Sequence, residues 1–409
     1  MTEQSQDAPF RVEVRMLFQG ALAIFLVTVL IGVLNGLDLV TFERPTLLTH
    51  AHAGTLGWIT LGVFAASLWL FGEGQPQTSS PYLRWLSLIA IVSVALYVLT
   101  FFLANVTARP VTGALVLLVI IGFLGWVVAQ SRRVALSVPH LAVLAALTTL
   151  TIGAVLGVLM QLALAGRANF LPQGAFVSHG ATMVAGFLIL GGMAITEWRL
   201  RPSGTPLTLS RAGIAQVGLP FLGGLSLMVG ALLDVFILTI LVAPLQVAGV
   251  IIYLWRLGPR IFGASWLTNG SNRLFALSAL FLMINVAMIA YLVVNYASRI
   301  DEIPSWLIFA LDHSVFIGVM TNGIFGLIYE ASRQRRSLWP WADHLVFWGV
   351  NIGLIGFVAG LMLEEAVLKR IFSPIMGTSI LLAMAVFAVR LQPGPGQATP
   401  AVRAEAPVR

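Results

Sequence analysis

Apolar residues in this chain fall into long runs, separated by short segments that contain Arg, Asp, Glu, Pro or Gly. A helix needs roughly 20 apolar residues to cross about 30 Å of hydrocarbon, and each run meets that length. Asp234 is nearly the only polar mark between the seventh and eighth runs. The predicted spans are residues 16–38, 45–72, 83–105, 110–131, 138–164, 172–197, 211–232, 234–257, 273–296, 304–330, 343–363 and 372–391.

This pattern predicts an all-α polytopic membrane protein with about twelve transmembrane helices. Of the 409 residues, 58% are hydrophobic and only 10% are charged, whereas a soluble domain carries about 25% charged residues. We expect residues 1–14 to be a cytoplasmic segment, 15–391 a single transmembrane domain, and 392–409 a disordered, Pro- and Ala-rich cytoplasmic tail. Cysteine is absent, so metal chemistry would use His, Met, Tyr, Asp or Glu.

The distribution of basic residues predicts the orientation. With a cytoplasmic N-terminus, seventeen of the 23 Lys and Arg residues fall in inner segments and six in outer ones, as the positive-inside rule requires. We therefore expect a multi-pass protein of the inner (plasma) membrane with both termini in the cytoplasm. The net charge of +7 is a topological signal and gives no case for a nucleic-acid partner.

Four histidines lie at membrane depth, in the outer halves of spans that enter from the outer face: His50, His52, His179 and His313. Ionisable groups at this depth are rare and usually face the bundle interior, so each is a functional candidate. Every span that carries one opens with Pro, and the histidines follow at similar offsets, which predicts one shared level in the membrane. The other two histidines lie at inner ends of spans, where an interfacial role is the simpler interpretation.

These histidines belong to the second, sixth and tenth spans. The spacing of four helices suggests three related four-helix units, each with its second helix turned toward a common centre. Glycines recur below the histidines and would let a neighbouring helix or a flat ligand approach closely. Imidazoles from two facing helices can clamp a haem, although they could also only cross-link helices by hydrogen bonds.

Two segments carry a family resemblance. THAHAGTLGWITLGVFAASLWLFG on the second span and ALDHSVFIGVMTNGIFGLIYEASRQRR on the tenth, within the twelve-span layout, resemble the haem–copper oxidase subunit I superfamily. The greatest likeness is to the NnrS-type haem- and copper-containing membrane proteins and to oxidase-like orphan subunits. The layout covers nearly the whole chain, whereas the motifs cover those two spans and, more weakly, the sixth. The resemblance implies three four-helix arcs and a low-spin haem held by one His from each quoted span.

Carried onto this chain, the resemblance implies haem b ligation by His313 and by His52 or His50. The last two lie about 200° apart around a helix, so only one can face a given iron; His52 is favoured because its spacing from Pro and Gly matches that of the others. His179 falls where the oxidases place a copper ligand, and a copper ion could bind it together with Met183 and His50.

The chain also departs from the oxidase pattern. The seventh span has no His, the tenth has only His313, and Met183 stands four residues beyond His179, where oxidases have Tyr. A standard binuclear centre is therefore missing, and oxygen or nitric oxide reduction by the usual mechanism is not expected. Whether the protein is an enzyme stays open; if it is, we expect an oxidoreductase of the haem–copper type.

One acidic residue and several arginines are further candidates for a haem site. Asp312, next to His313, either binds a proton or orients an imidazole, or is a hydrogen-bonded structural acid. Haem propionates need cations at the outer surface, and Arg44 and Arg299 are the candidates, with Arg109 and Arg167 as further choices.

The resulting hypothesis is a haem-binding membrane protein in respiratory, nitric oxide-related or metal-related redox or stress physiology. Its expected partners are the lipid bilayer, haem, and a redox partner or partner subunit. The alternatives are a haem–copper oxidoreductase with unconventional ligands and a cofactor-free small-molecule transporter, because Gly and Pro breaks in corresponding units are also typical of transporter repeats.

Overall fold

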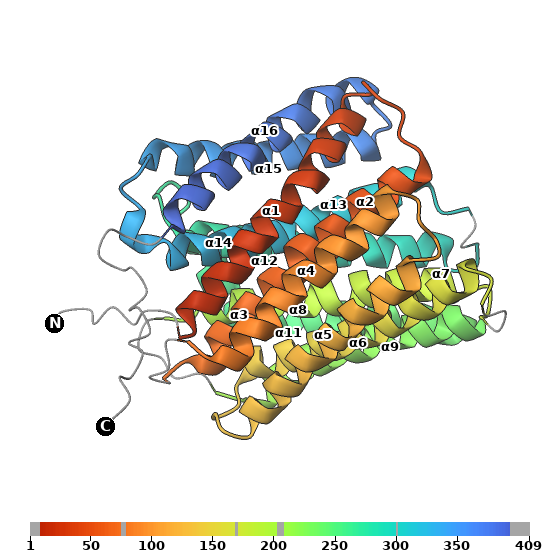
Figure 1. The fold of residues 1–409 in the computed structure, drawn as a ribbon, viewed down its shortest axis with the longest axis horizontal. Coiled ribbons are helices and arrows are strands. Elements are labelled where there is room, and N and C mark those ends of the chain that lie inside the picture. The colour runs from red at the N-terminus through yellow and green to blue at the C-terminus, as the bar shows by residue number, and fades with distance from the viewer. Residues whose placement is uncertain (1–8, 75–78, 168–170, 203–207, 300–301, 393–409) are drawn as a thin grey trace, which may run out of the picture.

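The protein, described by a computed structural model, is a bundle of long helices (Figure 1). Residues 9–74, 79–167, 171–202, 208–299 and 302–392 are described. Within these ranges there is no strand, and twelve helices are long and apolar enough to cross a membrane, which confirms the predicted fold class. Most of the predicted N-terminal segment and all but the first residue of the predicted tail lie outside the described residues.

The spans agree with the apolar runs, and three of them contain a π-helical segment, labelled η. In chain order the elements are α1 (Arg11–Gly36), α2 (Arg44–His52), η1 (Ala53–Thr60), α3 (Leu61–Gly72), α4 (Pro81–Phe102), α5 (Arg109–Ser131), α6 (Val138–Leu164), α7 (Ala175–Ala181), η2 (Thr182–Leu188), α8 (Ile189–Arg199), α9 (Arg211–Leu233), α10 (Phe236–Ile240), α11 (Val242–Phe262), α12 (Ser271–Tyr296), α13 (Ser305–His313), η4 (Ser314–Thr321), α14 (Asn322–Ala331), the short 3₁₀ turn η5 (Arg333–Arg335), α15 (Pro340–Met362) and α16 (Ala366–Arg390).

Charged residues extend two helices beyond their apolar runs. The first helix begins at Arg11 rather than at residue 16, because Glu13 is fully buried and accepts hydrogen bonds from the segment before α4. The last helix begins at Ala366 rather than at residue 372, and its Lys369 pairs with Asp38. A hydropathy pattern ends a span at its first charged residue. The helix can continue past that residue because partners elsewhere in the fold neutralise the charge.

The predicted break at Asp234 is confirmed. Asp234 has a φ of 55°, in the left-handed region, and its N–H donates to the carbonyl of Gly230. A left-handed residue after the last helical turn is a common way to end a helix, and Asp tolerates that conformation better than most residues. The chain therefore reverses direction here within a few residues.

Three spans form the centre of the bundle. In the apolar 18-residue stretch of each span, 83% of residues are buried in α2–η1–α3, and 67% in both α7–η2–α8 and α13–η4–α14. The corresponding share in the other nine spans is 33–50%. The inner spans contact one another, whereas the outer spans pack in chain order from α1 to α12 and from α15 to α16, which packs back on α1. Between α12 and α15 the tenth span intervenes, because α15 packs on α13 and η4. Each group of four spans thus contributes its second span to the centre, as the histidine spacing predicts.

Glycines of the inner spans pack against side chains of neighbouring helices. A methyl group on Gly62 would lie 2.6 Å from Ile324, and one on Gly192 would overlap Val319. At Gly323 the nearest atom, on Ile195, would be at 3.4 Å. These glycines were expected to admit either a neighbouring helix or a flat ligand. At these three positions they admit a neighbouring helix.

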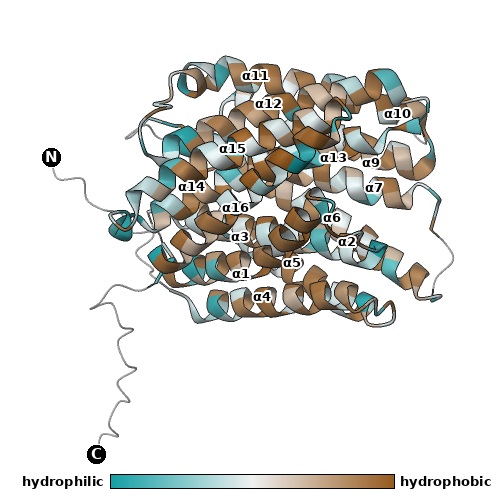
Figure 2. Ribbon diagram, turned by 90° about the horizontal axis from the view of Figure 1, so that it is seen from above, coloured by the Kyte–Doolittle hydropathy of each residue, from teal (hydrophilic) through white to brown (hydrophobic). Residues whose placement is uncertain are grey.

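The outer spans present apolar side chains to their surroundings. Figure 2 shows hydrophobic residues along much of the length of the helices, with hydrophilic residues gathered mainly near their ends. Leu118, Ile251 and Ile355 are each more than half exposed, although they lie in the middle of their spans. An exposed apolar belt of this kind is the surface that contacts lipid.

Candidate functional site

The three central spans share a local distortion beside their histidines. The segment η1 begins directly after His52, η4 directly after His313, and η2 three residues after His179. A π-helical turn inserts one extra residue into a helix and is frequent at functional sites. Thr60 and Thr321, the last residues of η1 and η4, donate to carbonyls five positions earlier, which helps to satisfy the widened turns.

All three spans begin at the same end of the bundle, opposite the end where α1 begins and α16 ends (Figure 1). We call it the histidine end, defined by the starts of α2, α7 and α13. The four membrane-depth histidines lie within the first helical segments from this end.

His50 and His313 form one pair. Their ring centroids are 6.5 Å apart and their planes are inclined by 28°. The Nδ1–H of His50 donates to the main-chain carbonyl of Thr28 on α1 (2.9 Å), and that of His313 donates to the carbonyl of Phe309 (2.7 Å). Because a carbonyl oxygen can only accept, both rings carry their proton on Nδ1, which leaves each Nε2 as a free lone pair.

The His50–His313 pair lies between α1 and α15. A methyl group on Gly32 of α1 would lie 3.0 Å from Cε1 of His50, so a glycine at this position lets the ring pack against the helix. The Phe357 ring of α15 packs on His313, with centroids 4.9 Å apart. Thr28 also donates its hydroxyl to the His50 carbonyl (3.1 Å), so α1 holds this histidine at two points.

His52 points the other way around its helix. Its ring stacks on Phe101 of α4 (centroids 4.0 Å apart, planes 18°) and meets Tyr97 edge-on at 5.6 Å. Its Nδ1–H donates to the carbonyl of Leu48 (2.7 Å). The guanidinium of Arg109 lies over the same Phe101 ring, 4.3 Å from its centroid.

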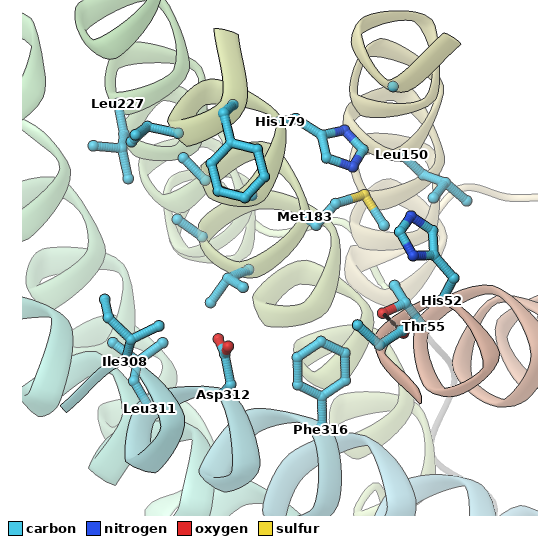
Figure 3. A pocket seen from close by; sticks show the side chains of 18 of the residues that line it. His52, Thr55, Leu150, His179, Met183, Leu227, Ile308, Leu311, Asp312 and Phe316 are labelled. Carbon is cyan, nitrogen blue, oxygen red and sulfur yellow. Dashed lines mark hydrogen bonds between the residues drawn. The ribbon is translucent and has the colours of Figure 1, made fainter. Parts of the chain in front are cut away.

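His179 lines the same cavity as His52. Its Nδ1–H donates to the carbonyl of Gly153 on α6 (2.9 Å), so it too has a free Nε2. Figure 3 shows the two rings turned toward one cavity, with the Met183 side chain between them and the Asp312 carboxyl across from them. The cavity has a volume of about 620 Å³.

The structure pairs the histidines differently from the sequence argument. His313 faces His50, whereas His52, which was favoured as its partner, faces His179. The near-opposite placement of His50 and His52 around one helix is as expected, but their spacing from Pro and Gly could not say which side meets the tenth span. The suggested copper set also changes, because His50 does not line the cavity that holds His179 and Met183.

The expected propionate partners lie at the surface. Arg299 is exposed and pairs with Glu302 (2.9 Å), and Arg44 is exposed at the first position of α2. Two other cations of the histidine end, Lys369 and Arg370, bind the carboxylate of Asp38 at 2.8 and 2.9 Å. These ion pairs, the one with Lys369 foremost, hold the pKa of Asp38 below its ordinary value.

Sequence reasoning missed several contributors to these sites. Thr28, Gly32, Tyr97 and Phe101 come from spans without a histidine, and nothing in their local pattern distinguishes them from packing residues. In the described part of the chain, no three His, Cys, Asp or Glu residues are grouped closely enough to hold a metal ion, so any metal would rest on histidine pairs with other donors.

The fold and these sites together define a polytopic α-helical membrane protein with two half-buried histidine pairs on its central spans. No family model matches the chain, and no curated protein is significantly similar to it. The functional argument therefore starts from the geometry of the two pairs.

Proposed function

We propose that the protein binds one b-type haem with His50 and His313 as axial ligands. The observation that carries this proposal is the distance between their rings. An imidazole nitrogen binds a first-row metal ion at about 2 Å, so two imidazoles on opposite sides of one iron place their centroids about 6 Å apart. The observed 6.5 Å is close to that distance.

The hydrogen bonds of the two rings support the same role. Histidines that bind metals usually donate their other ring N–H to a carbonyl or carboxylate, which fixes the tautomer and the ring orientation. Thr28 and Phe309 supply such carbonyls. The N–H of His50 joins its helix to α1, whereas His313 donates within its own helix, so a cross-linking role does not account for His313.

Ligation by two imidazoles favours electron transfer or redox sensing over reduction of a bound substrate. A haem held on both faces supplies one-electron transfer and leaves no open coordination position for a gas. We therefore favour electron transfer or redox sensing in respiratory or nitric oxide-related physiology over reduction of a bound substrate. The absence of a histidine from α9 and of a second one from α13–η4–α14 agrees with this choice.

The arrangement of spans supports membership of the haem–copper oxidase subunit I superfamily. Three central spans, each the second of four, carry the histidines, and the pair with ligand geometry joins the second span to the tenth. We extend the proposal to an inner-membrane protein with cytoplasmic termini, which puts the histidine end outside; the excess of Arg at the opposite end supports that orientation. Arg44 is the candidate partner for a propionate, because Arg299 is already paired.

Three alanine variants test the ligand assignment. The wild-type protein, purified in detergent and supplied with haem, should show a low-spin bis-imidazole optical spectrum. His50→Ala and His313→Ala should each lose that spectrum, while His52→Ala, the matched control on the same helix, should keep it. Loss in His52→Ala with retention in His50→Ala would return the assignment to the pair favoured by the sequence. A colourless wild-type protein that stays folded after haem addition would overturn the proposal.

A further inference from the structure

The cavity beside His52 and His179 is a second candidate site, separate from the His50–His313 pair. Its walls come from many spans and are largely apolar, with Leu150, Leu227 and Phe316 among the lining side chains (Figure 3). A volume of about 620 Å³ falls within the range of pockets that hold drug-sized molecules. A bare ion would leave most of this space empty, so the cavity is sized for an organic ligand.

The polar groups that line the cavity are three acceptors, on His52, His179 and Asp312, together with the hydroxyl groups of Tyr97, Tyr296 and two threonines. His52 and His179 use their Nδ1–H groups on carbonyls, so each presents an Nε2 lone pair. The hydroxyl protons of Thr55 and Thr239 are also occupied, since they donate to the carbonyls of Ala51 and Val235. The hydroxyl groups of Tyr97 and Tyr296 can donate to a ligand, but a ligand that only accepts hydrogen bonds would leave the two imidazoles and Asp312 without a donor.

Asp312 carries the one carboxyl group among the described residues that line the cavity. None of the described residues donates a hydrogen bond to it or forms an ion pair with it. A carboxyl group keeps at least one acceptor oxygen in either protonation state. An acid at membrane depth without a protein partner is costly, so its position is explained best by a ligand that supplies the missing hydrogen bond.

The charges around the cavity further limit the class of ligand that could bind there. Among the described residues that line the cavity there is no Lys or Arg, so a small anion would lose its hydration without a compensating cation. The acceptors also lie on two sides, because Asp312 stands across the cavity from the imidazoles (Figure 3). The fitting ligand is apolar, flat enough to lie beside Phe316, and carries two donors at opposite ends.

We propose that this cavity binds a membrane hydroquinone, with one hydroxyl donating to the carboxyl group of Asp312 and the other to Nε2 of His52 or His179. Hydroquinones dissolve in the bilayer, and their para hydroxyl groups are two donors on opposite sides of an aromatic ring. The proposal concerns binding and does not require haem at His50 and His313.

One glycine offers a way to fill the cavity without disturbing the helix. Gly180 lines the cavity, and a methyl group built on it meets no atom within 4 Å. Gly180→Phe should therefore occupy ligand space while leaving the protein folded. Gly125 on α5, exposed and equally free of neighbours, does not line the cavity, so Gly125→Phe is the matched control.

The experiment measures binding of tetramethylhydroquinone to detergent-purified protein by equilibrium dialysis. The hydroquinone is tested under reducing, anaerobic conditions beside its dimethyl ether, which has the same ring but no donors, and the quinone is tested with oxidised protein. We expect the hydroquinone to bind at least tenfold more tightly than either. Gly180→Phe and Asp312→Leu should weaken it at least tenfold, and Gly125→Phe should not.

Several outcomes would overturn this proposal. They are equal affinity for the dimethyl ether or the quinone, unchanged binding in Gly180→Phe, and tighter binding of an alkylamine or of Cu(I) alone than of the hydroquinone. The optical spectrum of each variant is recorded in parallel. A normal haem spectrum with no hydroquinone binding would reject this inference alone, and hydroquinone binding without haem would reject only the proposed function.

Discussion

The imidazole rings of His50 and His313 face each other across the second and tenth spans, with centroids 6.5 Å apart and both Nδ1 atoms tied to main-chain carbonyls. His52, two residues from His50, makes no such pair with His313 and instead packs on Phe101. One helix therefore presents imidazoles to two different sites on its opposite sides.

If His50 is an axial ligand, a free imidazole should be able to replace its side chain. We predict that His50→Gly loses the low-spin spectrum and that millimolar imidazole restores it, because Gly32 leaves room for a ring beside α1. The measurement is an optical titration with imidazole. His52→Gly is the control and should not respond; a spectrum of His50→Gly that is normal before imidazole is added would contradict the assignment.

The close packing at Gly192 makes a second prediction. A methyl group there would overlap Val319, so Gly192→Ala should destabilise the folded protein by about 1–3 kcal/mol, the usual cost of overpacking. Gly125→Ala meets no atom within 4 Å and should stabilise the helix by about 0.5–1 kcal/mol. Thermal unfolding in detergent compares the two, and the double variant Gly192→Ala/Val319→Ala should cost less than the sum of its parts.

Asp38 gives a pH-dependent prediction. Lys369 and Arg370 hold its pKa below the ordinary value of 3.8, so the ion pairs contribute stability above about pH 4, and that contribution is lost as pH falls through the lowered pKa. Asp38→Asn should be less stable than wild type at pH 7 by about 0.5–1 kcal/mol, the scale of partly exposed ion pairs. Asn tolerates the left-handed φ of 53° at this position, so the backbone is preserved.

The measurement for Asp38 is the difference in melting temperature between the two proteins across pH. The difference should shrink as the pH falls below 3.8 and through the lowered pKa, and it should also shrink in high salt. A constant difference at every pH would show that the substitution acts through packing rather than through charge.

The buried pair of Arg390 and Asp343 gives a further prediction. The Arg390 side chain is fully buried, donates to Asp343 at 2.6 Å, and also donates to the carbonyls of Leu338 and Trp339, which joins the end of α16 to the start of α15. Arg390→Met should cost about 3–5 kcal/mol, because it leaves a buried carboxylate without its cation.

A second substitution separates charge from packing at this pair. Arg390→Met/Asp343→Asn removes the unpaired charge and should recover part of the lost stability. Chemical unfolding of the two variants in detergent is the measurement. A double variant no more stable than Arg390→Met would mean that the loss comes from the carbonyl contacts of Arg390 instead.

Most of the fold could be predicted from hydropathy because the bilayer imposes a simple rule. Each span must be apolar for its whole length, so span positions and the break at Asp234 follow from local composition. The exceptions, the extra turns of α1 and α16, are places where Glu13 and Lys369 find partners on distant segments. Local composition carries no information about such partners.

The sequence by itself determined that the described part of this chain is an all-helical bundle with twelve spans, that three spans one third of the chain apart form its centre, and that four imidazoles lie near the same end of the bundle. Only the tertiary structure decided that His50, and not His52, meets His313, that His52 and His179 share a cavity, and that Asp312 faces it without a partner among the described residues. The physical reason is rotational. Hydropathy and spacing give the depth of a residue along a helix, but its direction depends on how the helix turns against its neighbours and on π-helical segments that change the register.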